Sequence, residues 1–256
     1  MKKKGQITLL IIVAIAIIAV IGITFFLTNQ SSSNNLESAF SKLGISNQAS
    51  VVESSILNCL KTAAEDANIV IGIQGGYYNE PQEYEYIGLT FLPYYYNKGN
   101  FLQPSIQGIQ NELSDFIDNN LDNCIEDLSF NDFNLEFKNS QSKSLIEKNE
   151  ILFNTDLSLT ITKDKTAEQF DLSDYPITIQ SSLYNAIEIS TFITESHKED
   201  PDLICVSCVA QMAEERDLFV EFLDFDNTDP TTLVVITETD ITTDPYIFQF
   251  LNRYSS

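Results

Sequence analysis

The chain has 256 residues, of which 43% are hydrophobic and 11% aromatic, enough apolar material for a folded core. It carries 37 Asp and Glu against 14 Lys and Arg, a net charge of −23. Because so negative a surface repels phosphate backbones, the composition argues against a nucleic-acid partner. The chain has one histidine and no tryptophan, and it lacks the common nucleophile, phosphate-loop and zinc-protease motifs. These absences argue against an enzyme.

The N-terminal segment combines a basic tip with a long apolar run. Lys2, Lys3 and Lys4 precede an uncharged stretch at 7–27. As a helix this stretch would span roughly 31 Å, the thickness of the hydrocarbon core of a bilayer. Because basic residues stay on the cytoplasmic side, the sequence predicts a single-pass protein of the cell membrane. Residues 1–28 would form its cytoplasmic tip and transmembrane helix, in contact with the lipid bilayer, and the remainder would lie outside the cell.

The same residues resemble a known signal. Lys-Lys-Lys-Gly-Gln before an Ile-rich helix resembles the class III signal peptide of archaeal type IV pilin-like proteins. The resemblance covers residues 1–27 and implies that a prepilin peptidase cuts between Gly5 and Gln6, with other surface proteins as partners. The family usually has Glu as the fifth residue after the cut, where this chain has Leu10, so growth into a long filament is less expected. An uncleaved signal anchor is the alternative, because the apolar run is too long for an ordinary cleaved signal.

A linker at 29–47 leads to a predicted helical hairpin with a tyrosine-rich insert at 48–130. Apolar side chains recur at helical spacing over 48–74 and 105–128, and Ser105 is a favourable N-cap for the second helix. The insert between them contains Pro and Gly and predicts a loop with a short hairpin. Its seven tyrosines, together with the nearby glutamates, form a candidate ligand surface for a sugar or a cation. The alternative is that the tyrosines cover a hairpin and the end of the hydrophobic core. The seven are Tyr77, Tyr78, Tyr84, Tyr86, Tyr94, Tyr95 and Tyr96.

The pattern changes to strand-like alternation in the last predicted region, 131–256. Strands are predicted at 133–137, 151–161, 176–179, 218–225, 233–237 and 246–250. One helix is predicted at 181–196 and another from Asp200-Pro201, an N-cap residue followed by a favoured first helical residue. The predicted fold class is therefore α+β: an N-terminal transmembrane helix, then a helical hairpin packed with a mostly antiparallel, β-rich ectodomain.

Four cysteines beyond the apolar run predict two disulfides. Cys59 and Cys124 lie on the inward stripes of the two predicted helices. In an antiparallel hairpin their levels differ by about four residues, or roughly 6 Å of helix rise, which a small slide can absorb. We therefore predict the pairing Cys59–Cys124, with two buried free thiols as the alternative.

Cys205 and Cys208 form a Cys-x-x-Cys motif at the start of a predicted helix. A helix N-terminus stabilises a thiolate, so this arrangement is able to support redox exchange. Asp229-Pro230 before an apolar strand is similar to the thioredoxin arrangement, but no strand runs directly into Cys205. A structural disulfide is the preferred interpretation; buried thiols, a redox centre and a metal site are the alternatives. Zinc is disfavoured because His197 is the only histidine.

The sequence favours a non-enzymatic, membrane-anchored surface protein with a pilin-like, interaction or adhesion role. The rival function is that of a membrane-tethered extracytoplasmic thiol–disulfide oxidoreductase that uses Cys205 and Cys208. The acidic turn at 224–229 has calcium-like spacing but lacks the Gly and the closing Glu of an EF-hand loop. We therefore expect neither a metal nor a cofactor.

Overall fold

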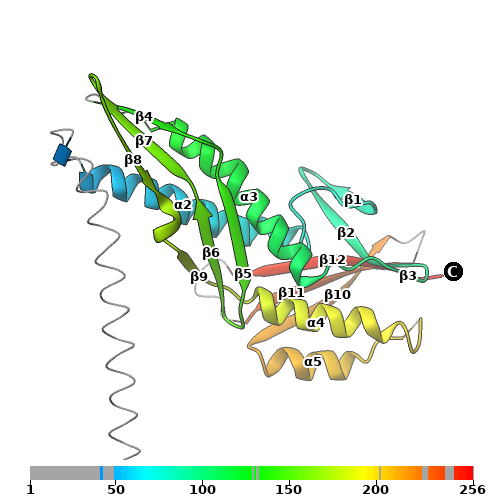
Figure 1. Ribbon diagram of the computed structural model, residues 1–256. Coiled ribbons are helices and arrows are strands. Elements are labelled where there is room, and N and C mark those ends of the chain that lie inside the picture. The colour runs from blue at the N-terminus through cyan, green and yellow to red at the C-terminus, as the bar shows by residue number, and fades with distance from the viewer. Residues whose placement is uncertain are drawn as a thin grey trace, which may run out of the picture.

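The computed structural model of the protein describes residues 41–42, 49–128, 130, 133–201, 203–226, 230–239 and 245–255, with the backbone alone at 49, 50, 170 and 226. The predicted membrane span at 7–27, the cleavage site Gly5-Gln6 and most of the predicted linker at 29–47 lie outside these residues. Figure 1 shows the described part as helices packed against twisted sheets.

The predicted fold class needs a correction. Within the described ranges, no helix is both long enough and apolar enough to cross a membrane. The longest of these helices, α2 (Ala49–Ile73), has an apolar stripe, but Lys61, Glu65 and Asp66 lie on its exposed side. The described residues therefore form an α+β fold of helices and mostly sheets, and the fold class with a transmembrane helix is wrong.

Helices α2 and α3 (Ile106–Glu126) form the predicted antiparallel hairpin. The end of α2 lies beside the start of α3, because a Cβ on Gly76 would lie 3.0 Å from Ile109. Toward the other end of the hairpin, Cys59 of α2 is bonded to Cys124 of α3. The N-cap of α3 is Ser105, whose Oγ accepts a hydrogen bond from the N–H of Gly108 at 3.0 Å. Both helix boundaries lie close to those that the apolar stripes predicted.

The tyrosine-rich insert contains the predicted short hairpin, β1–β2, and one further short strand, β3. It supplies three strands to a sheet with the order β1-β2-β12-β11-β10, in which β3 also pairs with β2. The pair β2–β12 is parallel and the others are antiparallel. Residues 91–96 of β2 are all buried. A strand that is buried on both faces lacks the alternation of apolar and polar residues by which strands are predicted from sequence. The strands are β1 (Tyr84–Ile87), β2 (Thr90–Asn97), β3 (Asn100–Phe101), β10 (Leu218–Asp226), β11 (Thr231–Glu238) and β12 (Ile247–Arg253).

Two smaller antiparallel sheets, β4-β7-β8 and β5-β6-β9, contain the middle of the chain. The single strand predicted at 151–161 is wrong, because the chain leaves one sheet and enters the other at the buried Leu157. Strands β5 and β8 were not predicted, since each has few apolar residues. The strands are β4 (Asn134–Phe137), β5 (Gln141–Ile146), β6 (Glu150–Asp156), β7 (Ser158–Lys163), β8 (Thr166–Asp171) and β9 (Ile177–Gln180).

Two further helices, α4 (Leu183–Ser196) and α5 (Val206–Glu214), lie side by side (Figure 1). The helix predicted from Asp200-Pro201 begins later, at Val206. The N–H of Leu203 donates to the carbonyl of Asp200 at 3.4 Å, a bond that precedes the start of α5.

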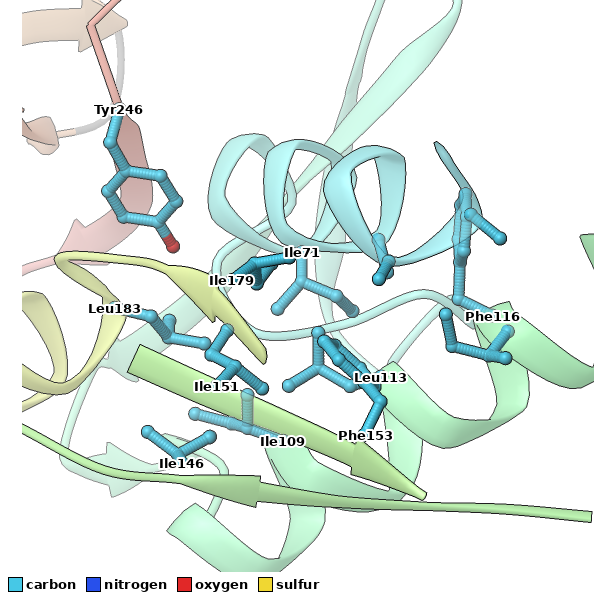
Figure 2. Packing of buried hydrophobic residues seen from close by; sticks show 14 of the residues in the cluster. Ile71, Ile109, Leu113, Phe116, Ile146, Ile151, Phe153, Ile179, Leu183 and Tyr246 are labelled. Atoms are coloured by element: carbon cyan, nitrogen blue, oxygen red, sulfur yellow. The ribbon is translucent and has the colours of Figure 1, made fainter. Parts of the chain in front are cut away.

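One hydrophobic core connects these elements. Ile71 of α2, Leu113 of α3 and Phe153 of β6 are fully buried in the same cluster (Figure 2). Phe248 and Phe250 of β12 belong to it as well. The predicted regions 48–130 and 131–256 therefore share a core, and the boundary between them does not separate two packing units.

Candidate functional site

The structure does not gather the seven tyrosines of the predicted ligand surface on one face. Tyr95 is fully buried, stacks on Phe250 with 4.2 Å between ring centroids, and donates a hydrogen bond to the Gly75 carbonyl at 2.9 Å. Its burial raises the pKa of its hydroxyl well above the usual value. Tyr96 is also buried, where it stacks on His197 with centroids 4.5 Å apart. Both tyrosines are core residues.

Tyr77 and Tyr78 pack against α3 and the residues that precede it. The Tyr77 hydroxyl donates to the carbonyl of Leu102 at 3.1 Å, and burial followed by the charge of Glu112 raises its pKa to about 12. The ring of Tyr78 meets that of Phe116 edge-on at 5.1 Å. Both tyrosines secure the connection after α2. In the β1–β2 hairpin that follows, residues 91–96 are buried, and the exposed apolar side chains lie at and next to the turn.

The tip of this hairpin projects apolar side chains into solvent. Tyr86 is 64% exposed, Ile87 is 39% exposed and Leu89 is fully exposed. Ile87 pairs with Thr90 across a two-residue turn in which Gly88 has a positive φ of 62°, a conformation that glycine adopts without strain. A tight turn of this kind holds its neighbours in a fixed orientation, with Tyr86 and Ile87, as consecutive strand residues, on opposite faces of the hairpin.

A carboxylate orients the tyrosines behind the tip. Glu80 accepts hydrogen bonds from the Tyr86 hydroxyl at 2.5 Å and the Tyr84 hydroxyl at 2.8 Å. The two rings pack edge to face with centroids 5.1 Å apart. The hydrogen bond from Tyr86, followed by that from Tyr84, lowers the pKa of Glu80. The hydrogen bond between Tyr86 and Glu80 also raises the pKa of the Tyr86 hydroxyl. Glu80, Tyr84 and Tyr86 therefore form one hydrogen-bonded cluster.

The other face of the hairpin is tied to β12. Glu85 accepts hydrogen bonds from the Tyr94 hydroxyl at 2.9 Å and from Arg253 Nη2 at 3.0 Å. The Arg253 guanidinium lies over the Tyr94 ring, 4.4 Å from its centroid. Asn97 also donates a hydrogen bond to Glu83. These contacts fix the hairpin to the sheet at its base.

Replacing Tyr86 by Phe is expected to raise the pKa of Glu80 toward its ordinary value of 4.5, because the carboxylate loses the shorter of its two hydrogen bonds. Tyr84→Phe should shift the same pKa in the same direction by less. A lowered pKa in the folded state stabilises the fold at high pH, and that stabilisation is lost as pH falls through the folded pKa. Titration of the ¹³C carboxyl resonance of Glu80 in the full chain measures both variants. An unchanged pKa in Tyr86→Phe, or a larger shift in Tyr84→Phe, contradicts the arrangement.

Both disulfides are formed, and no described cysteine is free. Cys59 and Cys124 have Cα atoms 5.8 Å apart, the pairing that the helical stripes predicted. Cys205 and Cys208 pair at the start of α5, with Cα atoms 5.3 Å apart. Both residues of this second disulfide are exposed, beside an exposed Leu203. The exposure rules out the alternative of buried thiols for this pair.

The acidic turn at 224–229 lies partly outside the described residues. Elsewhere, sequence reasoning singled out Tyr84 and Tyr86 but missed Ile87 and Leu89. The one local signal for them is Gly88, which marks a turn between two strand-like segments. Glu80 accepts hydrogen bonds from both tyrosine hydroxyls only because the chain folds back after Gly76. No local sequence pattern predicts that fold.

No protein-family model matches this chain, no curated protein matches its sequence, and no solved structure matches its fold.

Proposed function

We propose that this chain is a non-enzymatic cell-surface interaction protein, pilin-like or adhesive, that docks onto another protein through the tip of its β1–β2 hairpin. The observation that carries the proposal is the exposure of Tyr86, Ile87 and Leu89 on a hairpin whose base is fixed to the sheet. Apolar side chains clustered at the surface mark interaction sites more often than isolated ones do.

Two features support a location outside the cell. The basic tip and apolar run of residues 1–27 resemble a class III signal, which would bring prepilin peptidase and other surface proteins into contact with the chain. Two disulfides also suit an oxidising environment, because the cytosol keeps most thiols reduced. Mass spectrometry of the native N-terminus tests the processing: Gln6 as the first residue supports cleavage, and Met1 opposes it.

The charge around the hairpin favours a protein partner over a lipid surface. Glu80 accepts a hydrogen bond from the Tyr86 hydroxyl beside the tip, within a chain of net charge −23. Anionic headgroups repel such a surface, whereas a protein with an apolar pocket and a basic rim complements it. β1 is also an edge strand of its sheet, where a partner has access to it.

Site-specific photo-crosslinking tests the proposal in cells that produce the full chain. A photoreactive residue in place of Leu89 should give a discrete crosslinked product, and the added substitution Ile87→Ser should abolish it. The matched control places the same residue at Lys165, on the exposed polar turn between β7 and β8. Equal products from both positions, or none from position 89, contradict docking through the hairpin.

The exposed Cys205–Cys208 disulfide favours a second candidate function, thiol–disulfide exchange. An exposed pair at a helix N-terminus is accessible to a protein thiol, and the adjacent Leu203 offers an apolar contact. Insulin reduction by the full chain separates the two functions. Activity that Cys205→Ser abolishes would replace the non-enzymatic assignment with the oxidoreductase.

A further inference from the structure

The six-stranded sheet ends in a long strand, β10, which pairs on one side only among the described strands. With nine residues it is the longest of the described strands that lie at a sheet edge. Along an antiparallel pair, alternate residues turn their N–H and C=O groups away from the partner strand. β10 therefore presents a row of backbone donors and acceptors, and within the described residues no segment other than β11 pairs with them.

β10 lacks the lysines and prolines that commonly protect an open sheet edge. Its bulge falls between Asp224 and Asp226, at the end of the strand. The edge strand β5, by contrast, contains Lys143, and β9 follows directly on Pro176. Val220 and Phe222, which pack against the core, are only half-buried, so this edge is exposed to solvent on the core side as well.

The outer face of β10 is apolar at two positions and acidic between them. Phe219, Glu221 and Leu223 share this face, because side chains alternate along a strand. Phe219 is 52% exposed, Leu223 is 44% exposed, and Glu221 is exposed as well. The residues of β11 that pair with these three are half-buried. A strand added at this edge would place its own side chains opposite the same three residues.

The charge near this edge favours a basic partner. Residues 214–226 contain six acidic side chains and one arginine. That arginine, Arg216, already forms an ion pair with Glu188, with Nη2 and Oε2 3.2 Å apart. A second copy of the chain would bring the same acidic strand and a further net charge of −23, so pairing between copies is disfavoured. A segment that carries Lys or Arg opposite Glu221 is instead attracted.

We propose that β10 accepts an extended segment of another protein as an additional strand, with apolar residues opposite Phe219 and Leu223 and a basic residue opposite Glu221. The backbone groups of the edge provide affinity, and the three side chains provide specificity. The pattern apolar-x-basic-x-apolar is the same in both directions, so it holds for a parallel and for an antiparallel segment. β10 and β1 lie at opposite edges of the sheet, so this site and docking through the hairpin tip are tested separately.

Fluorescence anisotropy with the full chain and a labelled peptide tests the proposal. The probe is Thr-Val-Thr-Lys-Thr-Val-Thr, which places its Val, Lys and Val side chains on one face of a strand. It should bind saturably, and the same peptide with Glu in place of Lys should bind about tenfold more weakly, because like charges then lie opposite each other. The Lys peptide with every amide N-methylated lacks backbone donors and should not bind.

Charge reversal at Glu221 identifies the pairing. Glu221→Lys should weaken binding of the Lys peptide and strengthen binding of the Glu peptide, each about tenfold. Glu136→Lys, at an exposed position of the edge strand β4, changes the net charge equally and should leave both affinities unchanged. Equal effects of the two variants would show that the peptide responds to the total charge, which overturns the proposal.

Leu223→Lys tests the apolar contact. It should weaken binding of the Lys peptide about tenfold, and its matched control is Leu145→Lys, at a position 45% exposed on the edge strand β5, which should bind like the unmodified chain. Because both positions are exposed, the midpoint of urea unfolding should change little in either variant. Full affinity in Leu223→Lys, or no binding of the Lys peptide to the unmodified chain, overturns the proposal. So does sedimentation of the full chain as a dimer that Leu223→Lys dissociates, since the edge would then pair with a second copy.

Discussion

Replacing both Cys59 and Cys124 by Ala is expected to lower the free energy of unfolding by about 4 kcal/mol. The two cysteines are 65 residues apart in the sequence, so their bond closes a long loop and removes much of the conformational freedom of the unfolded chain. Cys59 is 3% exposed on the inner side of α2, where Ala adds no polar group. Urea unfolding of the full chain, followed by circular dichroism under non-reducing conditions, measures the change.

The second disulfide provides the matched control. Cys205 and Cys208 are three residues apart, and the same loop argument gives about 2 kcal/mol for replacing both by Ala. A reducing agent should lower the stability of each double variant by the contribution of the disulfide that it retains, about 2 kcal/mol where Cys205–Cys208 remains and about 4 kcal/mol where Cys59–Cys124 remains. Equal losses in the two double variants would show that loop length does not govern their effect.

Replacing Gly72 by Ala is expected to cost about 3 kcal/mol, because α2 packs at this point directly against the backbone of β12. A Cβ built on Gly72 would lie 2.3 Å from the carbonyl oxygen of Ile247 and 2.9 Å from the hydroxyl of Tyr246. The carbonyl belongs to Ile247, which pairs with Thr237 of β11, and Tyr246 is buried, so both neighbours are held in place. The midpoint of thermal or urea unfolding of the variant measures the cost.

Gly108 is the matched control, since it is also a helical glycine but has space around it. The nearest side-chain atom to a Cβ there would be Ser105 Oγ at 3.4 Å, an ordinary contact. Gly108→Ala should therefore be neutral or stabilise the protein by up to about 1 kcal/mol through the helix preference of Ala. If the two variants change stability by the same amount and sign, the close approach of α2 to β12 is not what constrains Gly72.

The helical hairpin shows how much a local pattern is able to predict. In α2 and α3 one stripe of side chains is buried and the other face is in water, so the apolar positions repeat at the helical period. Ser105 and Gly75-Gly76 mark where the helices begin and end. Because Cys59 and Cys124 lie on those stripes, the same pattern also predicted their pairing.

The strands show where local patterns fail. Residues 91–96 are buried on both faces, which removes the alternation that marks a strand, and β5 and β8 are too polar to be distinguished from loops. The single strand predicted at 151–161 is two strands in different sheets, β6 and β7, because consecutive strands can pair with different neighbours. Such choices depend on the packing of the whole molecule.

By itself the sequence determined the two amphipathic helices, their disulfide, the strands near the C-terminus and the acidic character of the surface, since each follows from neighbouring residues or from composition. Only the tertiary structure decided that β2 lies parallel to β12 and that Tyr95 and Tyr96 are buried while Tyr86 is exposed. It also decided that β10 lies at the edge of its sheet with Phe219 and Leu223 exposed. The physical reason is that periodicity records which face of one element is buried, whereas partners distant in the chain are selected by the packing of all elements at once.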